Sequence, residues 1–216
     1  MTLPTRTTLT IYGSPRSRTM RVLWAAAELN LEYTHVPYGF ADPALKQPAF
    51  LRLNPAGAVP TIVDNGFALA ESLAINLYLA RKYAAADALP LYPTTSTAEA
   101  QVWRWTLWAQ GHLEPWVQQD ALLADLRSAI GDHAQRAVAA ALTVLDAALA
   151  ARPWLVLDHF TIADLNVAGV LSPSRAARLD LQPYPHVQRW LSACYARPAA
   201  VAIRHRFADF VDGPVT

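Results

Sequence analysis

The sequence predicts a chain of two parts, an α/β unit followed by an all-helical unit. Three observations support this fold class. Short strand-like runs alternate with helical runs in the first part, and almost every later run has helical periodicity. Between them, residues 84–95 have weak periodicity and two prolines, which is typical of a linker. The expected domains are therefore residues 1–85 and 93–216.

The first part follows the order β-α-β-loop-ββ-α. Asn30 can occupy the left-handed position that ends its first helix. The turn Asp64-Asn65-Gly66 supplies residues that tolerate positive φ between the two strands of a hairpin. The expected elements, in chain order, are strand 8–13, helix 19–30, strand 31–38, hairpin 58–69 and helix 71–83.

The second part consists of long amphipathic helical runs. Thr161 can cap one of these helices, and Asp164 can complete a capping box in which Glu or Gln is more usual. We interpret both residues as folding residues rather than catalytic ones. The expected helices are 97–117, 133–151, 160–171 and 186–196.

Composition excludes several classes of function. The chain has 216 residues, of which 53% are hydrophobic and 16% charged, and its formal net charge is +1. Such a balance gives no general attraction to nucleic acid or to an anionic membrane. The N-terminus lacks an apolar signal core, and no apolar run reaches the length of a membrane helix. With Cys194 as the single cysteine, we expect a cytoplasmic protein without an internal disulfide or a metal.

The loop Ser14-Pro15-Arg16-Ser17 lies between the first strand and the first helix. It has the spacing of the Cys-x-x-Cys loop of thioredoxin-like proteins, with serine in place of both cysteines. Dithiol exchange is therefore excluded at this position. A serine hydroxyl at a helix N-terminus can still donate a hydrogen bond to the thiolate of a ligand.

Val59-Pro60 precedes a strand, in a loop that approaches a helix N-terminus. This proline is a candidate for a cis peptide bond, which turns backbone donors and acceptors outward towards a peptide-like ligand. The alternative is an ordinary turn proline with a trans bond.

Glu71-Ser72 stands at the end of the hairpin, immediately before a helix. The first turn of a helix has unpaired N–H groups and a partial positive charge, which suit a carboxylate. Ser72 can add a hydroxyl donor and Glu71 can pair with an ammonium group. The pair could bind the α-carboxylate and α-amine of an amino acid, or could simply cap the helix.

The chain resembles the cytosolic glutathione transferases of the serine-dependent type, closest to the bacterial and phi- or theta-like classes. The resemblance rests on "YGSPRSRTMRVLW", "FLRLNPAGAVPTIVDNGFALAESLAINLYLARKY", "FTIADL" and "YPHVQRWLSACYARPA". It implies a thioredoxin-like N-terminal domain, an all-helical C-terminal domain and a homodimer. It also implies an enzyme that conjugates glutathione, as co-substrate, to a small hydrophobic electrophile. Glutathione-dependent isomerisation or dehalogenation, and a non-catalytic interaction module, are the alternatives.

The resemblance favours Ser17 as the catalytic serine. In serine-type transferases this residue lies four or five positions before an arginine of the first helix, and Ser17 lies four before Arg21. Ser14 occupies the position that cysteine has in omega- and glutaredoxin-like relatives and is the alternative. Tyr12 is a third candidate, which we interpret instead as a residue in the wall of the ligand site.

The remaining contacts with glutathione also follow from the resemblance. Lys46 matches the lysine that meets the glycyl carboxylate. Its neighbour, often histidine in related classes, is Leu45, and the residue before the Val-Pro pair, often Lys or Gln, is Ala58. Both departures remove polar contacts, whereas Val59 can still bond through its backbone. The expected glutathione-binding residues are Ser17, Lys46, Ala58, Val59, Glu71 and Ser72.

Trp105, Trp108, His112 and Trp116 have helical spacing along one stripe of the first long helix. An aromatic stripe is ordinarily part of a core or a domain contact. In the family, however, the corresponding helix faces the sulfur of glutathione, and ligand sites are mostly apolar. The residues expected to contact the hydrophobic substrate are Tyr12, Pro15, Trp108 and His112.

Overall fold

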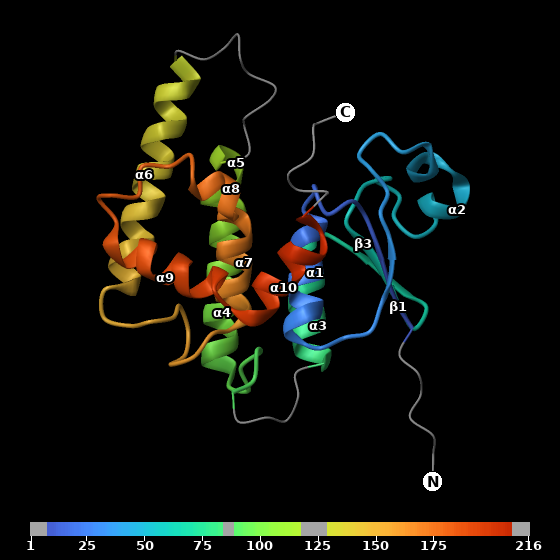
Figure 1. Cartoon of the computed structure of the whole chain (residues 1–216), viewed down its shortest axis with the longest axis horizontal. Coiled ribbons are helices and arrows are strands. Elements are labelled where there is room, and N and C mark those ends of the chain that lie inside the picture. The colour runs from blue at the N-terminus through green and yellow to red at the C-terminus, as the bar shows by residue number, and fades with distance from the viewer. Residues whose placement is uncertain (1–7, 84–88, 118–128, 209–216) are drawn as a thin grey trace. The chain divides into compact units, whose positions relative to one another are not determined.

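The computed structural model describes residues 8–83, 89–117 and 129–208 (Figure 1). The described residues form two compact units. Those up to Tyr83, together with those from Pro198 onward, form the first unit, and those from 89 to 197 form the second. The first unit is α/β and the second is helical, so the predicted fold class is confirmed.

A four-stranded mixed sheet is the centre of the first unit. Its order is β2-β1-β3-β4, with β1 parallel to β2 and antiparallel to β3, which pairs antiparallel with β4. Ile11, in the middle of the sheet, lies between His35 and Ile62 and is fully buried. The strands are β1 (Leu9–Tyr12), β2 (Thr34–Val36), β3 (Thr61–Asp64) and β4 (Phe67–Ala70).

The predicted turns of this unit are confirmed. Asn30 has a φ of 51° after α1, and Asn65 and Gly66 have φ values of 49° and 86° between β3 and β4. Helices α1 and α3 lie together on one side of the sheet and α2 lies on the other (Figure 1). The helical elements are α1 (Thr19–Glu28), the 3₁₀ turn η1 (Pro43–Lys46), α2 (Pro48–Leu51), α3 (Ser72–Tyr83) and α10 (Pro198–Arg206).

Helix α10 was not expected from the sequence, which assigned its residues to the helical domain 93–216. In the structure α10 packs against α1 and belongs to the first unit. The guanidinium of Arg206 lies 5.6 Å from the ring centroid of Tyr33, and the ring of Phe207 meets that of His35 edge-on at 5.2 Å. Helix α10 is therefore part of the unit that carries the loop Ser14-Pro15-Arg16-Ser17, which we call the opening loop.

The second unit is built around α7, whose residues are all buried. Helices α4 and α9 pack against α7, and α9 also packs against α6. Within the described residues, every helix is too short or too polar to span a bilayer. The helical elements are α4 (Ser96–Trp108), the π-helical segment η2 (Ala109–Leu113), α5 (Glu114–Val117), α6 (Ala129–Leu149), α7 (Ile162–Leu171), α8 (Pro173–Ala176) and α9 (Pro185–Tyr195).

Asp164 forms the predicted capping box at the start of α7. Its Oδ2 accepts hydrogen bonds from the amide and the hydroxyl of Thr161, at 2.9 and 3.0 Å. Its Oδ1 accepts from the amide of Leu155 and from Nε1 of Trp190, both at 2.9 Å. Burial raises the pKa of Asp164 even though these donors oppose the shift. The residue therefore ties three segments of the helical unit together.

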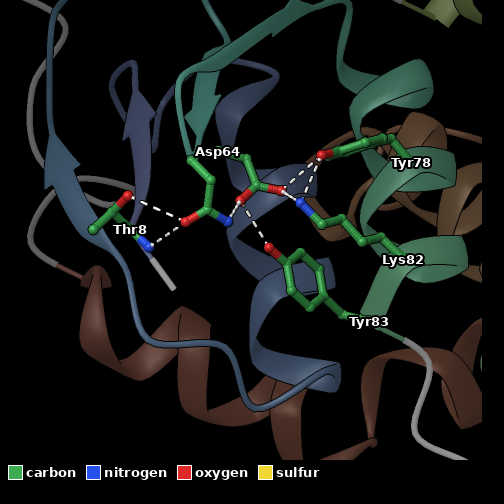
Figure 2. Close-up of polar contacts among 6 residues, drawn as sticks. Thr8, Asp64, Tyr78, Lys82 and Tyr83 are labelled. Carbon is green, nitrogen blue, oxygen red and sulfur yellow. Dashed lines mark hydrogen bonds and ion pairs between the residues drawn. The ribbon is translucent and has the colours of Figure 1, made fainter. Parts of the chain in front are cut away.

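Asp64, at the end of β3, ties the hairpin to the C-terminal end of α3 (Figure 2). Its Oδ2 accepts from Nζ of Lys82 at 2.7 Å and from the hydroxyl of Tyr78 at 2.8 Å. Its Oδ1 accepts from the hydroxyl of Tyr83 at 2.7 Å and from Nδ2 of Asn65 at 2.8 Å. Both carboxylate oxygens are thus occupied by protein donors, so we interpret this Asp64 cluster as structural.

Candidate active site

The opening loop between β1 and α1 is held by its backbone. The amide of Ser14 donates to the carbonyl of Tyr38 at 2.7 Å, and the amide of Ser17 donates to the carbonyl of Ser14 at 2.9 Å. Pro15, expected against the hydrophobic substrate, is buried. These bonds place both serines immediately before the first turn of α1, where the helix N-terminus favours an anion.

The hydroxyl of Ser17 makes three short contacts inside the loop. It donates to the carbonyl of Ser14 at 2.7 Å, accepts from the amide of Thr19 at 3.0 Å, and lies 2.7 Å from the Thr19 hydroxyl. Ser17 is only 8% exposed. Its proton must therefore leave the Ser14 carbonyl before it can be donated to a ligand.

Ser14, the alternative to Ser17, is half-buried. Its Oγ accepts a long hydrogen bond of 3.3 Å from the amide of Arg16. Within the described residues, the Ser14 hydroxyl proton has no acceptor. The two candidate serines thus differ: the hydroxyl of Ser17 is ordered by the loop, and that of Ser14 is open to a ligand.

The Val59-Pro60 peptide bond is cis, one of the two alternatives that the sequence left open. The loop before it is fixed by Asn54, whose Nδ2 donates to the carbonyl of Ala58 at 2.9 Å, and by Thr61, whose hydroxyl donates to the same carbonyl at 2.9 Å. Two hydrogen bonds from the protein itself therefore hold the Ala58 carbonyl in place. Across residues 8–83, 89–117 and 129–208, neither the amide nor the carbonyl of Val59 has a hydrogen-bond partner, so both can pair with an extended ligand.

The opening loop and the cis-proline loop are in close contact. A Cβ added at Gly13 would lie 2.9 Å from Cβ of Val59 and 2.0 Å from Oγ1 of Thr19. Gly13 also has a φ of 132°, a conformation that side chains rarely adopt. Glycine is therefore required at this position, and its small size brings the backbone of Val59 beside the start of α1.

The N-terminal end of α3 carries the predicted Glu71-Ser72 pair. Glu71 is exposed and has a φ of 70°, an uncommon conformation that is often found at functional sites. Ser72 is buried, and its Oγ accepts from Nη1 of Arg21 at 3.3 Å. Because Arg21 occupies a lone pair and not the proton, the Ser72 hydroxyl can still donate to a carboxylate.

Lys46 lies in η1, with an exposed side chain. Its Nζ donates to the carbonyls of Gly57 at 3.2 Å and Ala56 at 3.4 Å. The ammonium group is thereby brought to the loop that precedes Val59. Leu45, which replaces a frequent histidine, is buried and fills the core beneath the loop, so that position presents no side chain to a ligand.

Tyr12 belongs to a cluster of three aromatic rings. Its ring centroid lies 5.9 Å from that of Tyr38 and 5.6 Å from that of Phe50. The ring centroids of Tyr38 and Phe50 are 6.0 Å apart, and Phe50 is buried. The ring of Tyr12 therefore connects the end of β1 with α2.

Trp108 and His112 belong to the second unit. The π-helical segment η2 begins directly after Trp108 and contains His112, and its wider turns change the phase of the side chains. The predicted stripe is consequently uneven: Trp105 is buried, Trp108 and Trp116 are half-buried, and His112 is exposed. Trp105 is a core residue, packed edge-on against Trp108 at 5.2 Å.

Several residues of the site were not anticipated from the sequence. Thr19, Asn54 and Thr61 are all buried polar residues that order one of the two loops. His35 donates from Nε2 to the carbonyl of Gly13 at 2.8 Å. Threonine after a loop and asparagine before a proline are common enough that no sequence signal distinguishes these residues from ordinary turn residues.

Contacts within the first unit connect the opening loop, the loop that precedes Pro60 and the start of α3 into one candidate site. Gly13 meets Val59, Arg21 joins the start of α1 to Ser72, and Lys46 reaches the loop before Val59. The site thus combines two helix N-termini, a backbone edge at Val59 and a small set of hydroxyl donors. Such an arrangement suits a peptide-like ligand with a carboxylate, an amine and an anionic group.

Two family models match the chain. Residues 7–81 match the N-terminal domain of glutathione S-transferases, and residues 122–198 match their C-terminal domain. Glutathione S-transferase 3 of Zea mays is 37% identical over 207 residues, covering 88% of this chain and 90% of that protein. Glutathione S-transferase D7 of Drosophila melanogaster is 30% identical over 185 residues, covering 85% and 82%.

Solved structures agree with these matches. A delta-class glutathione transferase of Nilaparvata lugens superposes with a TM-score of 0.82 at 28% identity, covering 95% of each chain. Ure2p in complex with glutathione has a TM-score of 0.80 at 23% identity, covering 90% of this chain and 97% of that one. The chain belongs to the glutathione S-transferase family of enzymes, with a thioredoxin-like first unit and a helical second unit.

Proposed function

We propose that this protein is a serine-dependent glutathione transferase that conjugates glutathione to a small hydrophobic electrophile. The convergence of Ser17, the Val59 backbone and Glu71-Ser72 within the first unit is the observation that carries the proposal. The γ-glutamyl end of glutathione binds at the start of α3, the backbone of Val59 pairs with its cysteinyl residue, and Lys46 meets its glycyl carboxylate.

Ser17 stabilises the thiolate. A free thiol has a pKa near 8.5, so only about 3% is ionised at pH 7. A hydroxyl bond to an anion contributes about 1.5–3 kcal/mol, and about 0.5–1.5 kcal/mol of this replaces the lost bond to the Ser14 carbonyl. The N-terminus of α1 adds up to about 1 kcal/mol. Together these contributions lower the thiol pKa by roughly one to two units, without a metal or a protein base.

The open hydroxyl of Ser14 supports a second mechanism, in which that residue contacts the sulfur. Glutathione-dependent isomerisation or dehalogenation would use the same thiolate and the same first unit. Tyr12, Pro15, Trp108 and His112 are the proposed contacts of the hydrophobic substrate. A non-catalytic module is disfavoured by the hydroxyl groups at the start of α1 and by the carboxyl and hydroxyl groups of Glu71 and Ser72 at the start of α3.

We also propose a homodimer in the cytoplasm. Among the described residues, Phe67 of β4 and Trp103 and Leu107 of α4 are large apolar side chains left exposed, which suits an interface with a second copy. Sedimentation equilibrium at micromolar concentration should give twice the monomer mass of 23.7 kDa. A monomer mass alone would contradict this assembly.

The function is tested by titrating the purified protein with glutathione and then assaying a panel of electrophiles. We expect saturable binding, thiolate absorbance of bound glutathione at neutral pH, and conjugation of at least one electrophile. Binding without thiolate absorbance would contradict the proposed mechanism. Absence of binding would favour the non-catalytic alternative.

A further inference from the structure

We propose that Thr19 is a positioning residue that donates its hydroxyl proton to Ser17 Oγ and thereby orients the proton of Ser17 towards the ligand. The inference rests on the proposed role of Ser17. Thr19 is the first residue of α1 and is completely buried. Its Oγ1 lies 2.7 Å from Ser17 Oγ, the usual distance for a hydrogen bond between hydroxyl groups.

The direction of this bond follows from the protons available. A hydroxyl has one proton and two lone pairs. Ser17 gives its proton to the carbonyl of Ser14, which can only accept. The Thr19 hydroxyl must therefore be the donor in the bond between the two side chains. The amide of Thr19 donates to the second lone pair of Ser17, at 3.0 Å.

The same direction is required when a thiolate is bound. The Ser17 proton then turns from the Ser14 carbonyl to the sulfur, and its lone pairs still accept from the hydroxyl and the amide of Thr19. A hydroxyl that accepts hydrogen bonds becomes a stronger donor, because hydrogen-bonded groups in a chain polarise one another. Thr19 thus contributes to the stabilisation of the thiolate without contacting the sulfur.

Gly13 provides the space for the Thr19 hydroxyl. A methyl group at Gly13 would lie 2.0 Å from Thr19 Oγ1, far inside van der Waals contact. The backbone of Gly13 is fixed, since its amide donates to the carbonyl of Val36 at 2.8 Å and its carbonyl accepts from His35 at 2.8 Å. The fixed backbone of Gly13 therefore leaves the space in which the Thr19 hydroxyl faces Ser17.

The experiment measures the pKa of bound glutathione, by thiolate absorbance against pH at saturating glutathione, in wild type, T19V, T19A and T19S. Both T19V and T19A remove the hydroxyl, and we expect each to raise this pKa by about 0.5–1 unit, the scale of one neutral hydrogen bond. Turnover at neutral pH should fall about two- to eightfold, as the ionised fraction falls, with the KM for glutathione changed less than twofold. T19S should restore both values.

Thr143 offers a matched control. It lies on α6 in the helical unit, and its exposed hydroxyl donates to the carbonyl of Ala139 at 2.9 Å. T143V makes the same chemical change in a helix that carries no part of the proposed thiolate site. It should leave the pKa of bound glutathione unchanged, and thermal unfolding of each variant separates folding defects from this effect.

The outcomes separate this inference from the proposed function. If S17A raises the pKa of bound glutathione and neither T19V nor T19A does, Thr19 has no positioning role although the mechanism stands. If wild type has no thiolate absorbance at neutral pH, the proposed mechanism itself fails. A shift in T19V that T19S does not reverse would show that packing, and not the hydroxyl, is responsible, which also overturns the inference.

Discussion

The two ends of helix α3 use polar groups in opposite ways. At the C-terminal end, both oxygens of Asp64 accept hydrogen bonds, from Tyr78, Lys82, Tyr83 and Asn65 (Figure 2). At the N-terminal end, Glu71 is exposed in a rarely populated conformation.

The difference shows that one end of α3 contributes to the stability of the fold, whereas the other end is available for ligand binding. Donors of the Asp64 cluster are aimed at protein atoms, and a cation at the C-terminal end of a helix is also favourable. The first N–H groups of α3 have no acceptor within the helix, which makes that end suitable for a ligand carboxylate. Substitutions at one end should therefore change stability, and those at the other should change affinity.

Asp64→Ala is expected to have the largest effect. It leaves Lys82, Tyr78 and Tyr83 without their acceptor, and we expect the free energy of unfolding to fall by about 2–3 kcal/mol, since hydrogen bonds to a charge are lost and water reaches the exposed Lys82. Urea denaturation measures this change. Glutathione affinity, measured by calorimetry on the folded variant, should change less than twofold; a tenfold loss would mean that the two ends are coupled.

Glu71→Gln keeps the shape of the side chain and removes its charge. We expect glutathione affinity to weaken by at least about 1.5 kcal/mol, or roughly tenfold, because a bond to the ligand ammonium is lost. Glu71→Gly relieves the φ of 70° and should also lose affinity, without loss of stability. Unchanged affinity of Glu71→Gln by calorimetry would remove Glu71 from the binding site.

The pH dependence of stability should also distinguish the Asp64 cluster from the N-terminal end of α3. Burial raises the pKa of Asp64, but the hydrogen bonds from Lys82, Tyr83 and Tyr78 together lower it further, so the net pKa is below its usual value. Its contribution is then fully present above the unfolded pKa of about 3.9 and is lost as pH falls through the folded pKa. The stability difference between wild type and Asp64→Asn should therefore shrink below about pH 4. Thermal unfolding at several pH values measures it, and a difference independent of pH would contradict the pKa direction.

The contribution of Lys82 to stability has the opposite dependence on pH. Its hydrogen bond to Asp64 raises the pKa of Lys82 above the usual value. The resulting stability is present below the unfolded pKa of about 10.4 and is lost only as pH rises through the folded pKa. Between about pH 4 and about pH 10, Lys82→Met should be less stable than wild type by a constant amount, and the difference, which the same measurements detect, should shrink above about pH 10.

Local patterns in the sequence predicted much of the fold. The hairpin turn at Asn65 and Gly66, the left-handed Asn30 and the capping box at Asp164 depend on residues close in sequence, and all are present. Helix α10 could not be predicted in the same way. It is short and begins at Pro198. Its buried residues are buried because they pack against α1, which is distant in the sequence.

The candidate site was predicted in its residue types rather than in its hydrogen bonds. The Glu71-Ser72 pair lies immediately at the start of α3, as the sequence predicted, and Pro60 has the cis bond that the sequence left as one of two alternatives. The bond between Ser17 and the Ser14 carbonyl depends on the rotamer of one hydroxyl, which no sequence pattern specifies. The phase change at η2, which leaves His112 exposed, likewise arises from helix geometry.

The pKa of bound glutathione in Ser17→Ala and Ser14→Ala is the most direct test of the serine-stabilised thiolate. We predict that Ser17→Ala raises this pKa by about one unit and lowers turnover at neutral pH about three- to eightfold, with glutathione binding much less affected, because the lost bond exists only to the anion. Ser14→Ala should leave the pKa nearly unchanged. A rise in Ser14→Ala without one in Ser17→Ala would contradict the account and make Ser14 the residue that contacts the sulfur.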